Sequence, residues 1–568
     1  MSEIVIQSSR AQASRAAISK LYIAMRHLFI RGSYKPLGTS GEAVINALLE
    51  LNPEIYGSIA DPDRVELDGL LYIFQRLPQG IEECRYIKLI TREGYEKSFT
   101  PTVADKRRRD CYRIDDEQYY LEMTRGRSDI YDVLTHLTFM YIEAEKIMRN
   151  ALDSKNRPSR EWKMLRKIVA DIEHDKEYDR AVGFSYLSTL IGRTYKDSEK
   201  AFHKFAAAKG INNLFNIVYW LGKYAIEEHV EGNDREISFS TSLREGLGHH
   251  IYGEMWAKKI KTYLQDNKLL GRPIHIISSN LHSVMNSFYA KAALKNQLKI
   301  DSLLEVAEEL SIGENKELRE VVRNYALKNG MAEITDSPGV NITVQIFDCA
   351  QMDSSYFPKD LKGINFKEIS SDKVIVVMDY AFGEQAYECM DELLKPAEDE
   401  EIRTCLDVRS INILGKAGIL AGKKGDIMIP NAHIFEGTAD NYPFENKMDC
   451  TIFDDSGLDV FKGPMITVLG TSLQNRDILR YFYKSSWKSI GLEMEGAHYQ
   501  KAIQAASKIR NSIRKDVVLR YAYYASDNPL ETGATLSSGA LGKAGVKPTY
   551  LITICMLNGI LDTKENIT

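Results

Sequence analysis

Two glutamates flank a methionine at the point where an apolar run changes into a helical pattern. The stretch is SIGLEMEGAHYQKA, and the two carboxylates are Glu493 and Glu495. Charge at the end of a buried strand is costly unless it is paired or hydrogen-bonded. The two side chains would share one face of a strand, so they either face water together or bind a polar ligand.

Three other apolar runs also end in residues that can do chemistry. Ser526 and Asp527 follow VLRYAYYA, His282 follows RPIHIISSNL, and the segment 415–418 (Gly-Lys-Ala-Gly) follows SINIL. Glycines at a strand end let the backbone approach a ligand and expose N–H groups to an anion. Each feature also has a structural interpretation, because Ser-Asp-Asn-Pro caps helices, Gly-rich strand ends form turns, and single histidines are often structural.

These residues need a sheet to bring them together, and the sequence after about residue 272 predicts one. Short β-branched runs alternate with helical patterns, which is typical of an α/β domain with a mixed, partly parallel central sheet flanked by helices. We place this domain at residues 270–562. In such sheets, ligands bind just beyond the carboxyl ends of the strands.

The first part of the chain has a different pattern. Residues 1–245 carry apolar side chains at helical spacing and little β-branched alternation, so we predict an all-helical N-terminal domain of unknown role. The polar segment 227–242 is predicted to be a linker. The basic cluster 104–113 and the pair His249–His250 with Glu254 are predicted to be solvated surface rather than ligand-binding sites.

Composition excludes several classes of protein. The chain has 568 residues, enough for at least two domains, and its 74 basic and 79 acidic residues give no basic field for nucleic acid. No apolar run approaches the roughly 20 residues of a membrane span. Seven dispersed cysteines without a Cys-x-x-Cys pair predict reduced thiols and a cytoplasmic protein.

The order of the stretches resembles the nucleoside phosphorylase and nucleosidase superfamily. The resemblance rests on ILGKAGILAGKKGDIMIP, HIFEGT, SIGLEMEGAHYQKA and VLRYAYYASDNPL, with VIVVMDYAFGEQAYECMDELL before them. The continuation SDNPLETGATLSSG and the segment 468–496 are most similar to the catalytic domain of AMP nucleosidases. The likeness covers roughly residues 270–562 and leaves the N-terminal half unmatched.

The resemblance implies roles in cleaving an N-glycosidic bond. Asp527 would protonate a purine ring, and Ser526 would orient the Asp527 side chain. A carboxyl group at an apolar strand end has a raised pKa, which suits this role. Glu495 would hold the ribose hydroxyls, with Met494 as an apolar surface beside the sugar or base. Glu493 either binds the substrate or contacts the backbone or a neighbouring loop.

The nucleophile decides between hydrolysis and phosphorolysis. Phosphorylases of this superfamily bind phosphate through a serine in the Gly-x-x-Gly loop and usually through an arginine before it. In this chain the two glycines are Gly415 and Gly418. Lys416 stands at the serine position, and Ile413 stands at the arginine position. Water is therefore the expected nucleophile. The glutamate that activates water in small nucleosidases is absent, and His282 is its expected substitute. Lys416 could still bind inorganic phosphate or a nucleotide phosphate.

The loop HIFEGT contains two more candidates, Glu436 and Thr438, which either contact the substrate or form a plain turn. No cofactor and no metal is expected. The sequence thus predicts hydrolysis of a purine nucleoside or an AMP-like nucleotide, with no membrane and no nucleic acid as partners. Phosphorolysis and a non-catalytic nucleotide sensor are the alternatives, and a homo-oligomer is expected by analogy with the superfamily.

Overall fold

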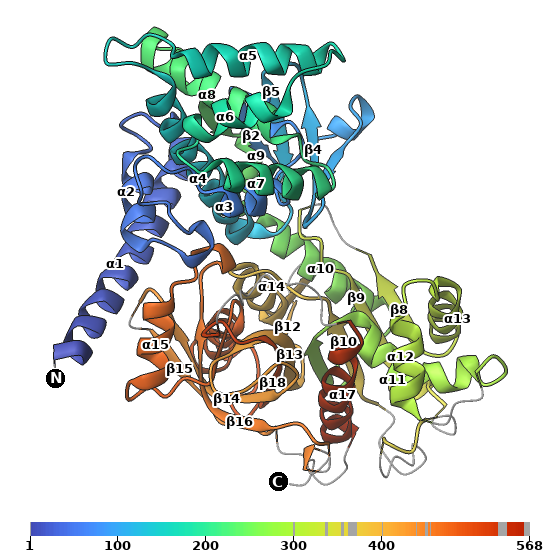
Figure 1. Cartoon of the computed structure of the whole chain (residues 1–568). Helices are drawn as coiled ribbons and strands as arrows, with labels where there is room; N and C mark the ends of the chain where they lie inside the picture. Colours follow the sequence, from blue (N-terminus) through green and yellow to red (C-terminus); the bar gives the residue numbers. More distant parts are fainter. Residues whose placement is uncertain are drawn as a thin grey trace. The chain divides into compact units, whose positions relative to one another are not determined.

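The structure is a computed structural model in two compact units (Figure 1). The first unit comprises Met1–His249 with Ser472–Ile478, and the second comprises His250–Thr471 with Leu479–Thr568. Cys450 and most of the segment SDNPLETGATLSSG lie outside the described residues. These are 2–298, 302–335, 339–353, 357–361, 372–399, 402–438, 440–448, 453–454, 456–531 and 542–561.

The first unit combines helices with a six-stranded sheet in the order β1-β6-β2-β5-β4-β3. Its strands are β1 (Ser33–Tyr34), β2 (Tyr86–Ile90), β3 (Thr102–Ala104), β4 (Arg107–Arg113), β5 (Gln118–Glu122) and β6 (Glu236–Phe239). Its helices are α1 (Ser2–Arg31), α2 (Glu42–Leu51), α3 (Leu67–Phe74), α4 (Gly126–Ala151), α5 (Arg160–Glu173), α6 (Arg180–Leu190), α7 (Tyr195–Ala207), α8 (Leu214–Glu231) and α9 (Thr241–Gly248).

The N-terminal part is mainly helical, as expected, but it is not all-helical, because it also contains this sheet. The basic cluster 104–113 supplies β4 and is partly internal: Arg109 is buried and bonds to Asp129 at 2.7 Å and to Asp132 at 3.0 Å. The predicted linker 227–242 contains the end of α8 and β6, which pairs with both β1 and β2. Short strands rich in arginine and tyrosine lack the apolar alternation that marks a strand in a sequence.

The second unit has the expected α/β pattern. Its strands are β7 (Ile274–Ser278), β8 (Met331–Ile334), β9 (Val344–Asp348), β10 (Val374–Met378), β11 (Ala397–Asp399), β12 (Ile402–Thr404), β13 (Val408–Ile419), β14 (Ile427–Phe435), β15 (Asn441–Pro443), β16 (Val460–Thr467), β17 (Gly491–Glu493) and β18 (Val518–Asp527). Its helices are α10 (Ile251–Asp266), α11 (Leu281–Leu294), α12 (Leu303–Ser311), α13 (Lys316–Leu327), α14 (Gln385–Leu394), α16 (Gly496–Gln504), α17 (Val546–Leu561) and, from Leu479 on, α15 (Arg476–Lys484).

The main sheet of this unit is mixed and curls into a ring at one side. Strand β13 is parallel to β7 along its first half, and β7 is parallel to β10. Further along, β13 pairs with β17 on one edge and with β18 on the other. Because β18 pairs with β14, β14 with β16, and β16 with β17, these five strands close on one another. The curled part lies around β13, β14, β16 and β18 in Figure 1.

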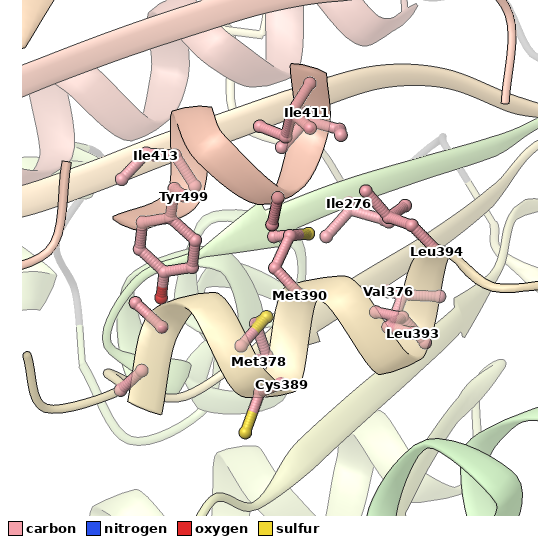
Figure 2. Close-up of a cluster of buried hydrophobic side chains, with 14 of the residues drawn as sticks. Ile276, Val376, Met378, Cys389, Met390, Leu393, Leu394, Ile411, Ile413 and Tyr499 are labelled. Atoms are coloured by element: carbon pink, nitrogen blue, oxygen red, sulfur yellow. The ribbon is translucent and has the colours of Figure 1, made fainter. Parts of the chain in front are cut away.

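Helices α14 and α16 cover one face of the parallel strands, as Figure 2 shows. Met390 and Leu394 of α14 and Tyr499 of α16 join one apolar cluster with Ile276 and Ile411. The Tyr499 hydroxyl also lies 2.8 Å from the Ser278 hydroxyl at the end of β7. The buried polar tip of the tyrosine is thus satisfied while its ring packs in the core.

One helix of the described residues is long and apolar enough to cross a membrane by length and composition. This segment, Gly542–Leu561, corrects the expectation that no apolar run comes near that length. It is 78% buried within the protein, where α17 packs against α11, α12 and β13. A helix that is apolar all round and buried in this way is the usual core helix of an α/β unit.

Candidate active site

Strand β18 carries a buried acid at its carboxyl end. The Asp527 side chain is held through Oδ1, which lies 2.5 Å from the Ser526 hydroxyl, and that hydroxyl is also 3.1 Å from the carbonyl of Ala417 on β13. Oδ2 is buried without a hydrogen-bond partner among the described residues. Burial raises the pKa of Asp527, although the Ser526 hydrogen bond and the charges of Lys416 and Lys424 oppose the shift.

Glu493 accepts structural hydrogen bonds through both of its carboxylate oxygens. One of its oxygens accepts a hydrogen bond from the Thr467 hydroxyl at the end of β16. The other accepts the backbone N–H groups of Glu495 and Gly496 as the chain leaves β17 and enters α16. Burial raises the pKa of Glu493 to about 7, and these hydrogen bonds partly offset the rise. Glu493 therefore contacts the backbone and a neighbouring strand, which is the structural role that the sequence left open beside substrate binding.

Glu495 does not share a strand face with Glu493, because β17 ends at Glu493 and Glu495 is the N-cap residue of α16. It is only partly exposed, and its Oε1 accepts the backbone N–H of Gly383 at 2.9 Å. Gly383 adopts a φ of 57°, a left-handed conformation that favours glycine. Burial, with the Glu493 charge, raises the pKa of Glu495 to about 8.

Asp527 ends β18 and Glu495 follows the end of β17, and these two strands pair with opposite edges of β13. Gly418 of β13 pairs with Leu492 of β17 on one edge and with Asp527 of β18 on the other. Adjacent strands are about 4.8 Å apart, so the ends of β17 and β18 are separated by roughly 10 Å across β13, the scale of a nucleoside. Met494, directly before Glu495, is buried.

The Gly-Lys-Ala-Gly segment lies inside a strand and not in a loop at its end, which corrects the prediction. Strand β13 continues to Ile419 and pairs with β18 from Ser410 to Gly418. A Cβ on Gly415 would lie 2.7 Å from the Tyr523 ring, so this glycine accommodates a buried tyrosine. Between the two glycines, the Lys416 side chain is exposed.

The remaining candidates lie at the start of α11 and after β14. His282 is exposed in the first turn of α11, after Asn280, whose side chain caps that helix. Desolvation lowers the pKa of His282, and the charge of Asp379 opposes this shift. In the HIFEGT loop Glu436 is buried, and exposed Thr438 bonds to Asp440 at 3.2 Å within a turn.

The structure adds residues that sequence reasoning missed. Gly383 and Thr467 hold the two glutamates, and each follows or ends an apolar run, which is the signal that could have identified it. Tyr523 and His433 are buried beside them, with the Tyr523 hydroxyl 3.4 Å from His433 Nε2. In the described part of the chain, no cluster of three or more His, Cys, Asp or Glu could hold a metal ion.

Several solved structures match about half of this chain. They include the native futalosine hydrolase of Helicobacter pylori strain 26695 (12% identity, 50% of this chain and 97% of that one, TM-score 0.30) and the apo 5'-methylthioadenosine nucleosidase of Arabidopsis thaliana (12%, 52% and 97%, 0.28). Uridine phosphorylase of Schistosoma mansoni with thymidine is another (11%, 54% and 91%, 0.31). Similarity at this level transfers neither substrate nor reaction. No curated protein matches the chain.

A family model matches residues 42–317 and 310–562, which together make up most of the sequence and include the ends of β17 and β18. The matched residues include parts of both units. On this match the chain belongs to the family of unknown function DUF6909.

Proposed function

We propose that this protein hydrolyses the N-glycosidic bond of a purine nucleoside or AMP-like nucleotide. The proposal rests on the environment of the buried Asp527 carboxyl group. Its Oδ1 is hydrogen-bonded to the Ser526 hydroxyl, and its Oδ2 has no hydrogen-bond partner among the described residues. Burial favours its neutral form, which can donate a proton. A carboxyl group with a raised pKa at a strand end is suited to giving a proton to a departing heterocycle.

In the proposed reaction, the bond between the sugar C1' and the base nitrogen breaks, and its electron pair stays with the base. Asp527 delivers the proton that neutralises the base, while water adds to C1' and gives up a proton to His282 or solvent. The products are the free base and ribose or ribose phosphate. Glu495 accepts hydrogen bonds from the sugar hydroxyls and stabilises the positive charge that develops on the ring.

Two features favour hydrolysis over phosphorolysis. Gly415 faces the Tyr523 ring, so the Gly-x-x-Gly segment lacks the open backbone that a phosphate loop requires. Lys416 occupies the serine position of the resembling phosphorylases and supplies a point charge in place of a hydroxyl.

The test is release of free base from adenosine, inosine, AMP and ATP, followed by chromatography with and without inorganic phosphate. Hydrolysis predicts release that does not depend on phosphate. Asp527→Asn and Glu495→Gln should each lower kcat/KM by about 100-fold or more, the scale of losing an acid or a key transition-state contact. Asp516→Asn, which alters an exposed aspartate paired with Arg514, is the matched control.

Release only with phosphate would indicate phosphorolysis. Tight binding of nucleotide without release, unchanged in Asp527→Asn, would favour a nucleotide sensor. Full activity in both active-site variants would refute the assignment of Asp527 and Glu495.

A further inference from the structure

Two lysines lie beside Asp527 without an ion-pair partner among the described residues. Lys416 is on β13, two positions before Gly418, the residue that pairs with Asp527. Lys424 is in the turn between β13 and β14. Both side chains are exposed, and both charges act on the Asp527 carboxyl group.

The turn that carries Lys424 is anchored to the residues around Asp527. The Gly425 N–H donates to the Ala525 carbonyl at 2.9 Å, and the Asn528 side chain donates to the Gly422 carbonyl at 3.0 Å. Within the turn, buried Asp426 accepts the Lys423 N–H at 2.9 Å. The backbone on both sides of Lys424 is thus held against the end of β18, on the side of the site that carries the acid.

The neighbouring lysine differs in its partner. Lys423 Nζ lies 3.7 Å from Asp459 Oδ2 and forms an exposed ion pair with it. No ion pair of Lys416 or Lys424 is seen within the described residues, so two positive charges lie at the Asp527 end of the site, whereas Glu495 and Gly383 lie at the other strand end. A pair of ammonium groups attracts an anion without selecting its shape.

Resting on the function proposed above, we propose that the substrate is a purine nucleoside or nucleotide whose base carries a negative charge, bound by Lys416 and Lys424 beside Asp527. The charge belongs to the base because Asp527 is the residue assigned to the heterocycle and Glu495 the residue assigned to the sugar. The same two cations would stabilise the electron pair that the base takes when the glycosidic bond breaks.

Xanthosine and inosine provide a direct comparison, because the base of xanthosine ionises near neutral pH and that of inosine does not. We expect the kcat/KM ratio of xanthosine to inosine to exceed one in the natural protein. It should fall about tenfold in Lys416→Gln and in Lys424→Gln, the scale of losing one charge-assisted contact. Lys423→Gln is the matched control, with an unchanged ratio.

Adenosine and AMP form the second arm. If the lysine variants lower the AMP-to-adenosine ratio and leave the xanthosine-to-inosine ratio unchanged, the anion is a phosphate and the proposal is overturned. A xanthosine-to-inosine ratio that is unchanged in both lysine variants also overturns the proposal. Thermal unfolding and circular dichroism establish that each variant is folded.

Equilibrium binding separates failure of this proposal from failure of the proposed function. Calorimetry with free xanthine and hypoxanthine requires no bond cleavage. If no nucleoside is cleaved but xanthine binds more tightly than hypoxanthine through Lys416 and Lys424, the hydrolase proposal fails and the anionic-base site stands. Equal binding of the two bases overturns the anionic-base site.

Discussion

At the scale of single residues, the candidate site separates two glutamates that look equivalent in the sequence. Glu493 uses both oxygens for the Thr467 hydroxyl and two backbone N–H groups, so it has little capacity left for a ligand. Glu495 receives one backbone hydrogen bond and remains partly exposed. We therefore assign Glu493 to positioning and Glu495 to binding.

Removing the Thr467 hydroxyl tests the positioning role. Thr467→Val deprives Glu493 of a donor and leaves the Ala497 N–H without its acceptor, so the turn that carries Glu495 loosens. We expect KM to rise about tenfold with a smaller change in kcat, because one charged hydrogen bond is lost. Thr467→Ser keeps the hydroxyl and should restore KM. Equal KM values in the Val and Ser variants would contradict the assignment.

Ligand binding should also release a proton at Glu495. Its pKa is raised to about 8, so the empty site holds it mainly neutral at pH 7, whereas hydroxyl donors favour the carboxylate. Calorimetry in buffers of different ionisation enthalpy should show close to one proton released per ribonucleoside at pH 7. Glu495→Gln should release none. A 2',3'-dideoxynucleoside is the control, since it lacks the hydroxyls that Glu495 is proposed to bind.

At the scale of elements, close packing of β14 against the start of α16 constrains the site. A Cβ on Gly496 would lie 2.2 Å from the His433 ring and 2.8 Å from Glu493. The glycine of the Glu-Met-Glu-Gly motif thus lets the helix begin directly against a buried histidine. His433 itself stacks on Phe444 and lies near Tyr523.

Gly496→Ala should accordingly destabilise the protein by about 2 kcal/mol, the usual scale of overpacking a core. The double variant Gly496→Ala, His433→Ala should recover part of this loss, because the clashing ring is removed. Denaturant unfolding of the two single variants and the double variant gives the coupling free energy. Strict additivity would show that the clash is relieved elsewhere.

At the scale of the whole molecule, buried titratable groups set the pH range of stability. Burial lowers the pKa of His136, His275 and His433 to about 3, and it raises the pKa of Glu82, Glu143 and Glu493 to about 7. The histidines contribute stability above their unfolded pKa of about 6.5 that is lost as pH falls toward 3. The glutamates contribute stability below about 4.5 that is lost as pH rises through 7.

The two sets nearly cancel between about pH 4.5 and 6.5, where their slopes have opposite signs and similar size. We expect the melting temperature to be highest in this window and to fall on both sides, which thermal scans from pH 3 to 9 would measure. Glu493→Gln should flatten the decline above pH 6.5. A melting temperature that rises steadily to pH 9 would contradict this account.

Sequence patterns alone predicted the long apolar strands of the second unit and the residues at their ends, but not its short strands such as β8 and β15. The apolar runs before Gly415, before Glu493 and before Asp527 became β13, β17 and β18, because buried strands are often continuous apolar segments. The patterns did not reveal the sheet of the first unit, where tyrosine and arginine strands such as β4 gain stability only from partners such as Asp129.

The roles of the candidate residues, binding a ligand or positioning a neighbour, follow from the tertiary structure alone. Pairing across β13 brings the ends of β17 and β18 to either side of Gly418, and contacts distant in sequence separate the roles of Glu493 and Glu495. The length of β13 and the role of Gly415 also followed from its pairing with β18 and from the Tyr523 ring. The physical reason is that burial and hydrogen-bond partners, which set a side chain's charge and freedom, come from segments far apart in the chain.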